Sequence, residues 1–168
     1  DWVFNNLTFS GTAATTTKTG SSTITVSRTL TVFTGHHLIA GVATQWDING
    51  SSSPFVLSGT FDAERSTFRY RSTSSTSITP ATYWKLWLAP SAAGSPTYTL
   101  GSGALATLNT LSIGDGTNPV TVNANTNDPN ITVNRNVNVS SSATLVASDV
   151  GTFSVFGDWD NDGVFTSS

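Results

Sequence analysis

The sequence predicts an all-β protein that folds as a right-handed parallel β-helix, or β-solenoid, of about eight coils. Three features favour this fold: short apolar strands between corners rich in Asn, Gly, Ser and Thr, one unit that occurs twice, and no helical periodicity of useful length. A coil of about 20 residues accounts for all 168 residues. One alternative stays open, a pilin-like β-sandwich with strand donation between subunits, and it would pair its strands antiparallel.

The repeated unit decides the organisation of the chain. Residues 24–40, ITVSRTLTVFTGHHLIA, match residues 131–147, ITVNRNVNVSSSATLVA, so that Arg28 aligns with Arg135 at an offset of 107 residues. The match resumes on both flanks at an offset of 104, as for Leu7 and Leu111. We therefore expect a single domain in which residues 1–65 and 105–168 are two copies around an unduplicated middle, residues 66–104. The longer offset is expected to span about five coils.

The first copy is expected to contain short strands joined by polar corners. Residues 1–11 read as two strands around a turn at Asn5 and Asn6, and residues 12–22 as a threonine-rich loop or polar strand. One straight strand over residues 24–32 would place Arg28 on the apolar face, where an unpaired charge is costly. We therefore predict corners at residues 27–29 and, in the second copy, at residues 134–136.

The middle and the second copy continue the strand pattern. Residues 81–89 favour a strand over a helix, because Tyr and Trp are frequent there and Pro80 and Pro90 flank the run. From Gly101 onward, apolar residues at strand spacing are the candidates to point inward. They are Leu108, Leu111, Ile113, Val120, Val122, Ile131, Val133, Val137, Val139, Leu145, Phe153, Val155, Trp159, Val164 and Phe165.

The composition limits the classes of function. Only 10% of the residues are charged and the net charge is −3, so the chain lacks the basic stripe that binds nucleic acid. No apolar run is long enough for a membrane span, and we expect no signal peptide in this sequence. The chain has neither Cys nor Met, which favours an extracellular or cell-surface location, where a thiol and a thioether would be oxidised.

One acidic stretch resembles the first half of a calcium loop. Asp158, Asp160 and Asp162 alternate and are followed by a glycine, and the backbone carbonyl of Val164 would add a further oxygen ligand. The bidentate acid expected at the twelfth position of such a loop lies past the last residue. The alternative interpretation is a polar turn between two strands. Calcium is thus the one cofactor that the sequence suggests.

Aromatic residues of the middle segment form a second candidate site. Tyr83, Trp84 and Trp87 are close enough in sequence to make an aromatic contact patch for sugars, or else to fill the interior of a wide coil. We predict no enzymatic activity, since Glu64 is the only glutamate, no acid cluster suits glycoside cleavage, and no G-x-S-x-G motif frames a serine.

The succession N-x-L-x-(apolar)-x-G, I-x-V-x-x-x-(apolar)-x-V and G-x-F-x-V-x-G-D-W-x-N-x-G-x-F-T resembles the repeat region of large secreted bacterial surface proteins. Autotransporter passengers and haemagglutinin-type adhesins with β-helix repeats are examples. The resemblance covers most of the chain, and its motifs consist of Gly, Asn and alternating apolar residues. It implies a right-handed parallel β-helix and an extracellular structural or adhesive role, and it carries over no catalytic residue.

The expected function is structural. A β-solenoid leaves unpaired strand edges at its two ends, and such edges either need a cap or recruit a neighbour. A head-to-tail contact that does not close on itself generates a fibre. We therefore expect a subunit or repeat segment of a filament, stalk or surface layer that assembles end to end with copies of itself. The alternative is a carbohydrate- or surface-binding adhesin module that uses the aromatic patch to contact surface glycans.

Overall fold

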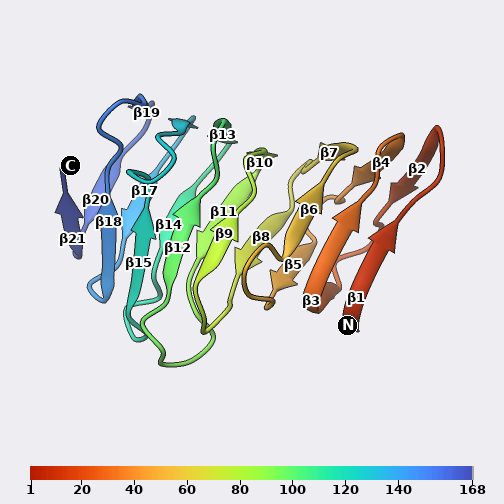
Figure 1. Cartoon of the computed structure of the whole chain (residues 1–168), viewed down its shortest axis with the longest axis horizontal. Helices are drawn as coiled ribbons and strands as arrows, with labels where there is room; N and C mark the ends of the chain where they lie inside the picture. The colour runs from red at the N-terminus through yellow and green to blue at the C-terminus, as the bar shows by residue number, and fades with distance from the viewer. Residues whose placement is uncertain (168) are drawn as a thin grey trace.

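The chain folds as a β-solenoid with its coils side by side along the long axis (Figure 1). This computed structural model describes residues 1–167, and over that range it contains twenty-one strands and no helix. Every strand pair in this range is parallel. The pilin-like sandwich, which requires antiparallel pairs, is therefore wrong. Among the described residues, no helix is available to cross a membrane.

Each full coil places one strand on each of three faces, and the first face is a ladder of eight levels. It contains the first halves of β1 (Trp2–Phe9) and β3 (Thr23–Val32), and then β5 (Gln45–Ile48), β8 (Thr67–Tyr70), β11 (Lys85–Leu88), β14 (Leu111–Ile113), β17 (Val137–Val139) and β20 (Trp159–Asn161). Successive partners such as Ile24, Trp46 and Phe68 are 22 residues apart, so one coil is close to the expected length.

The second face also has eight levels, and the third has seven. The second face contains the other halves of β1 and β3, and then β6 (Phe55–Leu57), β9 (Thr76–Ile78), β12 (Thr97–Leu100), β15 (Val120–Asn123), β18 (Ala143–Val146) and β21 (Val164–Thr166). A parallel bridge between Ser52 and Thr76 joins the β6 and β9 levels. The third face contains β2 (Ala14–Thr17), β4 (His36–Ile39), β7 (Thr60–Asp62), β10 (Thr82–Tyr83), β13 (Ala104–Thr107), β16 (Asn130–Val133) and β19 (Phe153–Val155).

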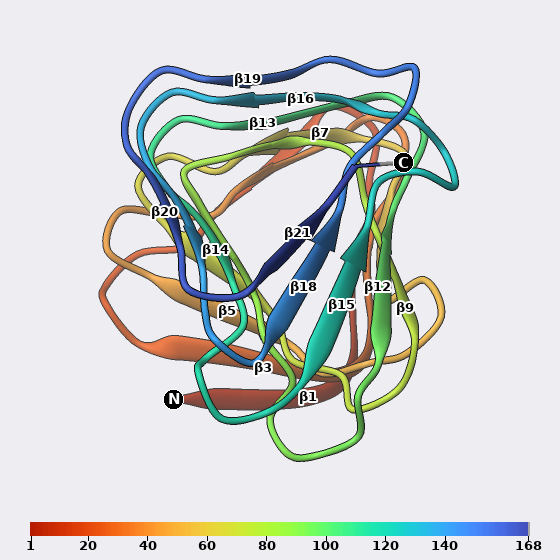
Figure 2. The ribbon, with the colours of Figure 1, turned by 90° about the vertical axis from the view of Figure 1, so that its left-hand side faces the viewer.

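The solenoid is right-handed, as expected. Figure 2 looks at its C-terminal end, where the chain rises along β18, crosses leftward along β19 and descends along β20. This path is anticlockwise while it advances toward the viewer, which defines a right-handed turn. The same hand is strongly favoured for parallel strands joined by crossovers.

Alternation within each strand points one set of side chains into the coil. In β8, Phe68 and Tyr70 are buried while Thr67 and Arg69 face outward. The ring of Phe68 stacks on that of Trp46 in the preceding coil, with the two centroids 5.7 Å apart. Apolar side chains stacked coil upon coil therefore form the core, and each coil stabilises its neighbours.

Three tyrosines lie inside the solenoid with their hydroxyls hydrogen-bonded. The hydroxyls of Tyr70 and Tyr83 are 3.2 Å apart, and the Tyr98 hydroxyl donates to the backbone oxygen of Ser72 at 2.5 Å. Burial raises the pKa of each tyrosine above its ordinary value of 10.0. The interior thus holds these phenols in their neutral form.

Two of the expected corners in the first copy are bends within one continuous strand. β1 is continuous through Asn5 and Asn6, where a register shift against β3 marks the bend from the first face to the second and no turn separates two strands. β3 is also continuous through residues 27–29, where it passes from the first face to the second, so the corner predicted there is a bend within one strand and not a break between two. Ser27 and Arg28 are consecutive and both exposed, and this bulge keeps the arginine off the apolar face. The corner at residues 134–136, between β16 and β17, is confirmed.

Most of the residues expected to point inward after Gly101 are buried. Leu108 is an exception, since it lies in the corner after β13 and is 40% exposed. Val164 also faces outward, because the alternation of β21 places Phe165 inside, where it pairs with the buried Leu145. The two predictions are wrong for different reasons: Leu108 follows the last residue of its strand, whereas Val164 and Phe165 are neighbours in one strand and cannot both point inward.

The two copies of the repeated unit fold alike, strand by strand. β5 pairs with β3 in the register in which β19 pairs with β16, and β7 pairs with β4 as β21 does with β18. The two halves of β1 correspond to β13 and β14, and β2 corresponds to β15. Matched strands lie on different faces, however, since β5 belongs to the first face and β19 to the third. The 107-residue offset is thus one face short of five coils.

Candidate functional site at the open ends

The acidic stretch that resembles a calcium loop is the last strand of the first face together with the corner after it. Trp159 pairs with the buried Val137, and Asp158 and Asp160 flank it on an extended backbone, with Asp162 in the corner before β21. Within residues 1–167, no three His, Asp or Glu side chains are placed to hold a metal ion. The structure does not gather these carboxylates, because a strand spreads along its length the ligands that a loop would wrap around an ion.

The expected carbonyl ligand, that of Val164, belongs to the first residue of β21. It therefore lies beyond the corner that separates the first face from the second. Calcium binding therefore stays a prediction from the sequence.

The predicted aromatic patch is divided between the interior and the surface. Tyr83 is fully buried, and its hydroxyl donates to the backbone oxygen of Thr79 at 2.8 Å, so its assignment to a contact surface is wrong. Trp84 lies in the corner between β10 and β11, and Trp87 faces outward from β11; both are half-buried. The alternation of β11 and the corner before it separate three residues that the sequence places together.

An arginine covers each of the two surface tryptophans. The guanidinium carbon of Arg65 lies 5.7 Å from the ring centroid of Trp84, and that of Arg69 lies 5.4 Å from the centroid of Trp87. The indole nitrogen of Trp87 donates to the backbone oxygen of Gly114 at 2.9 Å. Cation–π and hydrogen-bond contacts of this kind hold each ring in one orientation.

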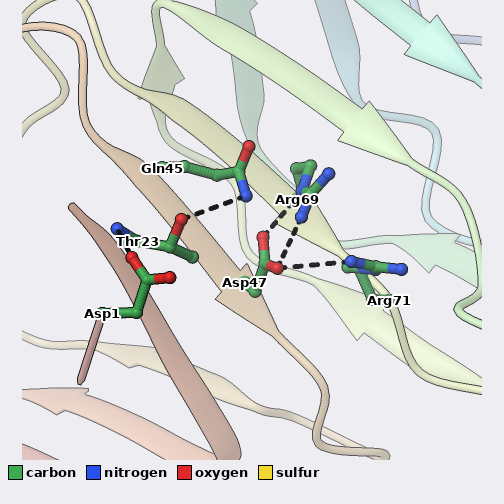
Figure 3. A network of polar contacts seen from close by, with 6 residues as sticks. All are labelled: Asp1, Thr23, Gln45, Asp47, Arg69 and Arg71. Atoms are coloured by element: carbon green, nitrogen blue, oxygen red, sulfur yellow. Dashed lines mark hydrogen bonds and ion pairs between the residues drawn. The ribbon is translucent and has the colours of Figure 1, made fainter. Parts of the chain in front are cut away.

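A charged network that the sequence does not predict lies on the outside of the first face (Figure 3). The carboxylate of Asp47 accepts two hydrogen bonds from Arg69, from Nε at 2.6 Å and from a terminal nitrogen at 2.5 Å. Arg71 adds a contact of 3.3 Å to the same carboxylate. Asp47 and Arg69 are 22 residues apart, which is one coil, so the pair becomes visible only once the length of the coil is known.

A polar hollow of about 430 Å³ lies beside Trp87 on the same face. Hydroxyl and amide side chains supply most of its lining, together with the ammonium group of Lys85 and the aromatic ring of Trp87. The lining residues are Gln45, Thr67, Lys85, Leu86, Trp87, Thr110, Ser112 and Asn138.

The N-terminal end of the solenoid is apolar and open. β1 pairs only with β3 and β2 only with β4 among the described strands, so each leaves one backbone edge free. Trp2 is 59% exposed, and a hollow of about 310 Å³ reaches from it past Phe4, Leu7 and Phe9 to Trp46 in the third coil. The end thus presents a concave apolar surface rimmed by unpaired peptide groups.

The C-terminal end presents the matching features. β19, β20 and β21 each pair with one strand only within residues 1–167. Trp159 is 39% exposed and packs edge-on between Phe153, at a centroid distance of 5.5 Å, and Phe165, at 5.2 Å. Three aromatic rings therefore form an apolar cluster across the last coil.

Each end combines strand edges that have no partner among the described strands with exposed aromatic side chains. An unpaired strand edge offers a row of hydrogen-bonding groups to another strand, and the exposed rings offer apolar area to whatever covers them. Comparison with known proteins adds no assignment, since no family model, no curated protein and no solved structure matches the chain.

Proposed function

We propose that the chain is an extracellular structural protein, a subunit or repeat segment of a filament, stalk or surface layer that assembles end to end with copies of itself. The observation that carries the proposal is the chemistry of the two ends, each of which combines free strand edges with exposed aromatic rings. The absence of Cys and Met from the sequence supports a location exposed to oxidants.

The parallel pairing of all described strands supports a head-to-tail polarity for the proposed assembly. A parallel ladder continues only when the C-terminal end of one copy meets the N-terminal end of the next. Such a head-to-tail contact uses two different surfaces that lie at opposite ends of the long axis, so copies add along this axis and do not close into a ring. Growth into a fibre follows.

The exposed rings supply a modest driving force. Taking side-chain areas of about 200–250 Å², the exposed fractions of Trp2, Trp159 and Phe165 together offer roughly 300 Å², worth about 7–8 kcal/mol when buried. The loss of translational and rotational freedom costs about 4–15 kcal/mol. Apolar burial and this cost are comparable, so the new strand hydrogen bonds decide the balance, and assembly should depend strongly on protein concentration.

Light scattering against concentration, with negative-stain microscopy, tests the proposal. The unmodified chain should form fibres, and Trp159→Lys should raise the concentration required, because about 100 Å² of lost apolar burial corresponds to about a 60-fold change in Kd. Val56→Lys is the matched control, since Val56 is also 39% exposed but lies on the side of the solenoid. A chain that stays monomeric at millimolar concentration would refute end-to-end assembly.

The hollow beside Trp87 favours a second candidate function, a carbohydrate- or surface-binding adhesin module. Hydroxyls, amides and one aromatic ring around a shallow depression suit the polar and apolar faces of a sugar. Glycan-array binding that is lost in Trp87→Ala, with fibre formation unchanged, would support it. Trp84→Ala is the control, because Trp84 lies in a corner outside this hollow. Equal binding by both variants and the parent chain would exclude the hollow as the site.

A further inference from the structure

We propose that the next molecule in the fibre docks rotated by one face about the fibre axis. Its residues 2–4 then continue β19 of the preceding molecule, its residues 7–9 continue β20, and its β2 continues β21. This inference rests on the proposed end-to-end assembly and specifies its register. It fixes which residue of one copy lies over which residue of the next.

The first argument is the number of levels on each face. The first and second faces have eight levels and the third has seven, so the C-terminal end is one strand short above β19. An unrotated copy would place residues 2–4 on β20 and leave a gap of one strand on the third face. A rotated copy places its first strand in that gap, and all three ladders continue without interruption.

The second argument is that the chain already contains this arrangement. β13, β14 and β15 are the counterparts of the two halves of β1 and of β2, and they lie on the third, first and second faces. The rotation between the two internal copies is therefore the rotation that the join requires. The opening strands of the repeated unit fit these three faces, because β13, β14 and β15, which open the internal second copy, already lie on them.

The internal copy also gives the contacts across the join. Leu105, Ile131 and Phe153 are successive partners on the third face, and Trp2 is the counterpart of Leu105, so Trp2 would cover Phe153. On the first face, Leu7 would cover Trp159 in the same way. Trp2 and Phe153 would thus bury each other's rings, and Leu7 would cover the ring of Trp159.

Cysteine pairs can report this register without ambiguity, because the chain has no cysteine of its own. Val3 faces outward and would lie over Ser154 in the rotated join but over Asp160 in an unrotated one. Neighbouring parallel strands are about 4.8 Å apart, within the Cα separations that a disulfide spans. Val3 lies at one end and both partners at the other, so each disulfide can form only between two copies.

The test compares Val3→Cys/Ser154→Cys with Val3→Cys/Asp160→Cys under oxidising conditions at concentrations where the parent chain assembles. We expect the Ser154 pair to give a ladder of covalent multimers on a non-reducing gel and the Asp160 pair to give no more than Val3→Cys alone. A ladder from the Asp160 pair, or none from either pair in fibres seen by microscopy, would overturn the rotated register and leave end-to-end assembly standing. Failure of the parent chain to form fibres would instead refute the assembly itself.

Discussion

Two glycines at equivalent places in the repeated unit provide a matched test of the solenoid. A Cβ on Gly59 would lie 2.3 Å from the backbone oxygen of Phe33 and 2.4 Å from that of His36. A Cβ on Gly163 would lie at nearly the same distances, 2.4 and 2.5 Å, from the oxygens of Ser140 and Ala143. Both glycines therefore let one corner approach the corner of the preceding coil, and alanine at either place forces the two apart.

The cost of this separation is calculable to an order of magnitude. The added methyl group must move by roughly 1 Å to reach ordinary contact, and overpacking of this kind costs about 1–3 kcal/mol. Gly59 lies in the third coil, where β8, β9 and β10 cover its neighbours, so Gly59→Ala strains the continuous array. A loss of ~2 kcal/mol lowers the Tm of a domain of this size by about 4–8 °C.

Gly163→Ala should behave differently, although it creates the same contact. It lies in the last coil, and β21 can detach while the coils before it stay stacked, because a solenoid is stabilised by interactions between neighbours only. Scanning calorimetry at concentrations below assembly should show a Tm drop for Gly59→Ala and almost none for Gly163→Ala. Hydrogen exchange should then show fast exchange confined to β21 in the latter. Equal losses of Tm in both variants would refute the argument.

Two further predictions concern stability. Above pH 10 the unfolded chain ionises its tyrosines while Tyr70, Tyr83 and Tyr98, whose pKa values burial raises, stay protonated in the folded chain. The free energy of unfolding should therefore fall by up to about 1.4 kcal/mol per pH unit for each of the three tyrosines. Urea titrations between pH 9 and 11.5 would measure the total slope, and Tyr98→Phe should reduce that total by roughly a third. Asp47→Ala should lower the free energy of unfolding by about 2–3 kcal/mol, because it leaves the two arginines without their carboxylate. Asp62→Ala on the third face removes only an exposed hydrogen bond from the Glu64 backbone N–H and should lower it by about 1 kcal/mol or less. Urea unfolding at pH 7 compares these two variants, and equal midpoints would contradict a stabilising network.

The sequence was sufficient for the fold because its strands alternate regularly and its repeat is long. Ile24 and Ile131 are inward residues of equivalent strands, as their shared motif predicts. The corners were less predictable, and the two arginines show why. Arg135 is flanked by asparagines, which favour turns, and a corner forms there; Arg28 is flanked by Ser and Thr, and β-branched Thr favours the strand that continues through it.

The candidate site could be predicted only in part. That the ends of a solenoid carry free edges follows from the fold class, but which aromatic rings gather there depends on where the coils begin and end. Tyr83 and Trp87 differ in burial because a corner at Trp84 intervenes, and no pattern in the sequence marks it. The contact between Asp47 and Arg69 depends on the 22-residue length of that coil, which varies along the chain and is known only from the pairing of the strands.

Helical reconstruction of the assembled chain by electron cryo-microscopy tests the central claim most directly. Seven complete coils and two further strands, at ~4.8 Å a level, predict a rise of about 37 Å per copy, with parallel ladders that continue unbroken across every join. Side-by-side packing of separate solenoids, or copies that meet through two like ends, would contradict end-to-end assembly through the open coils.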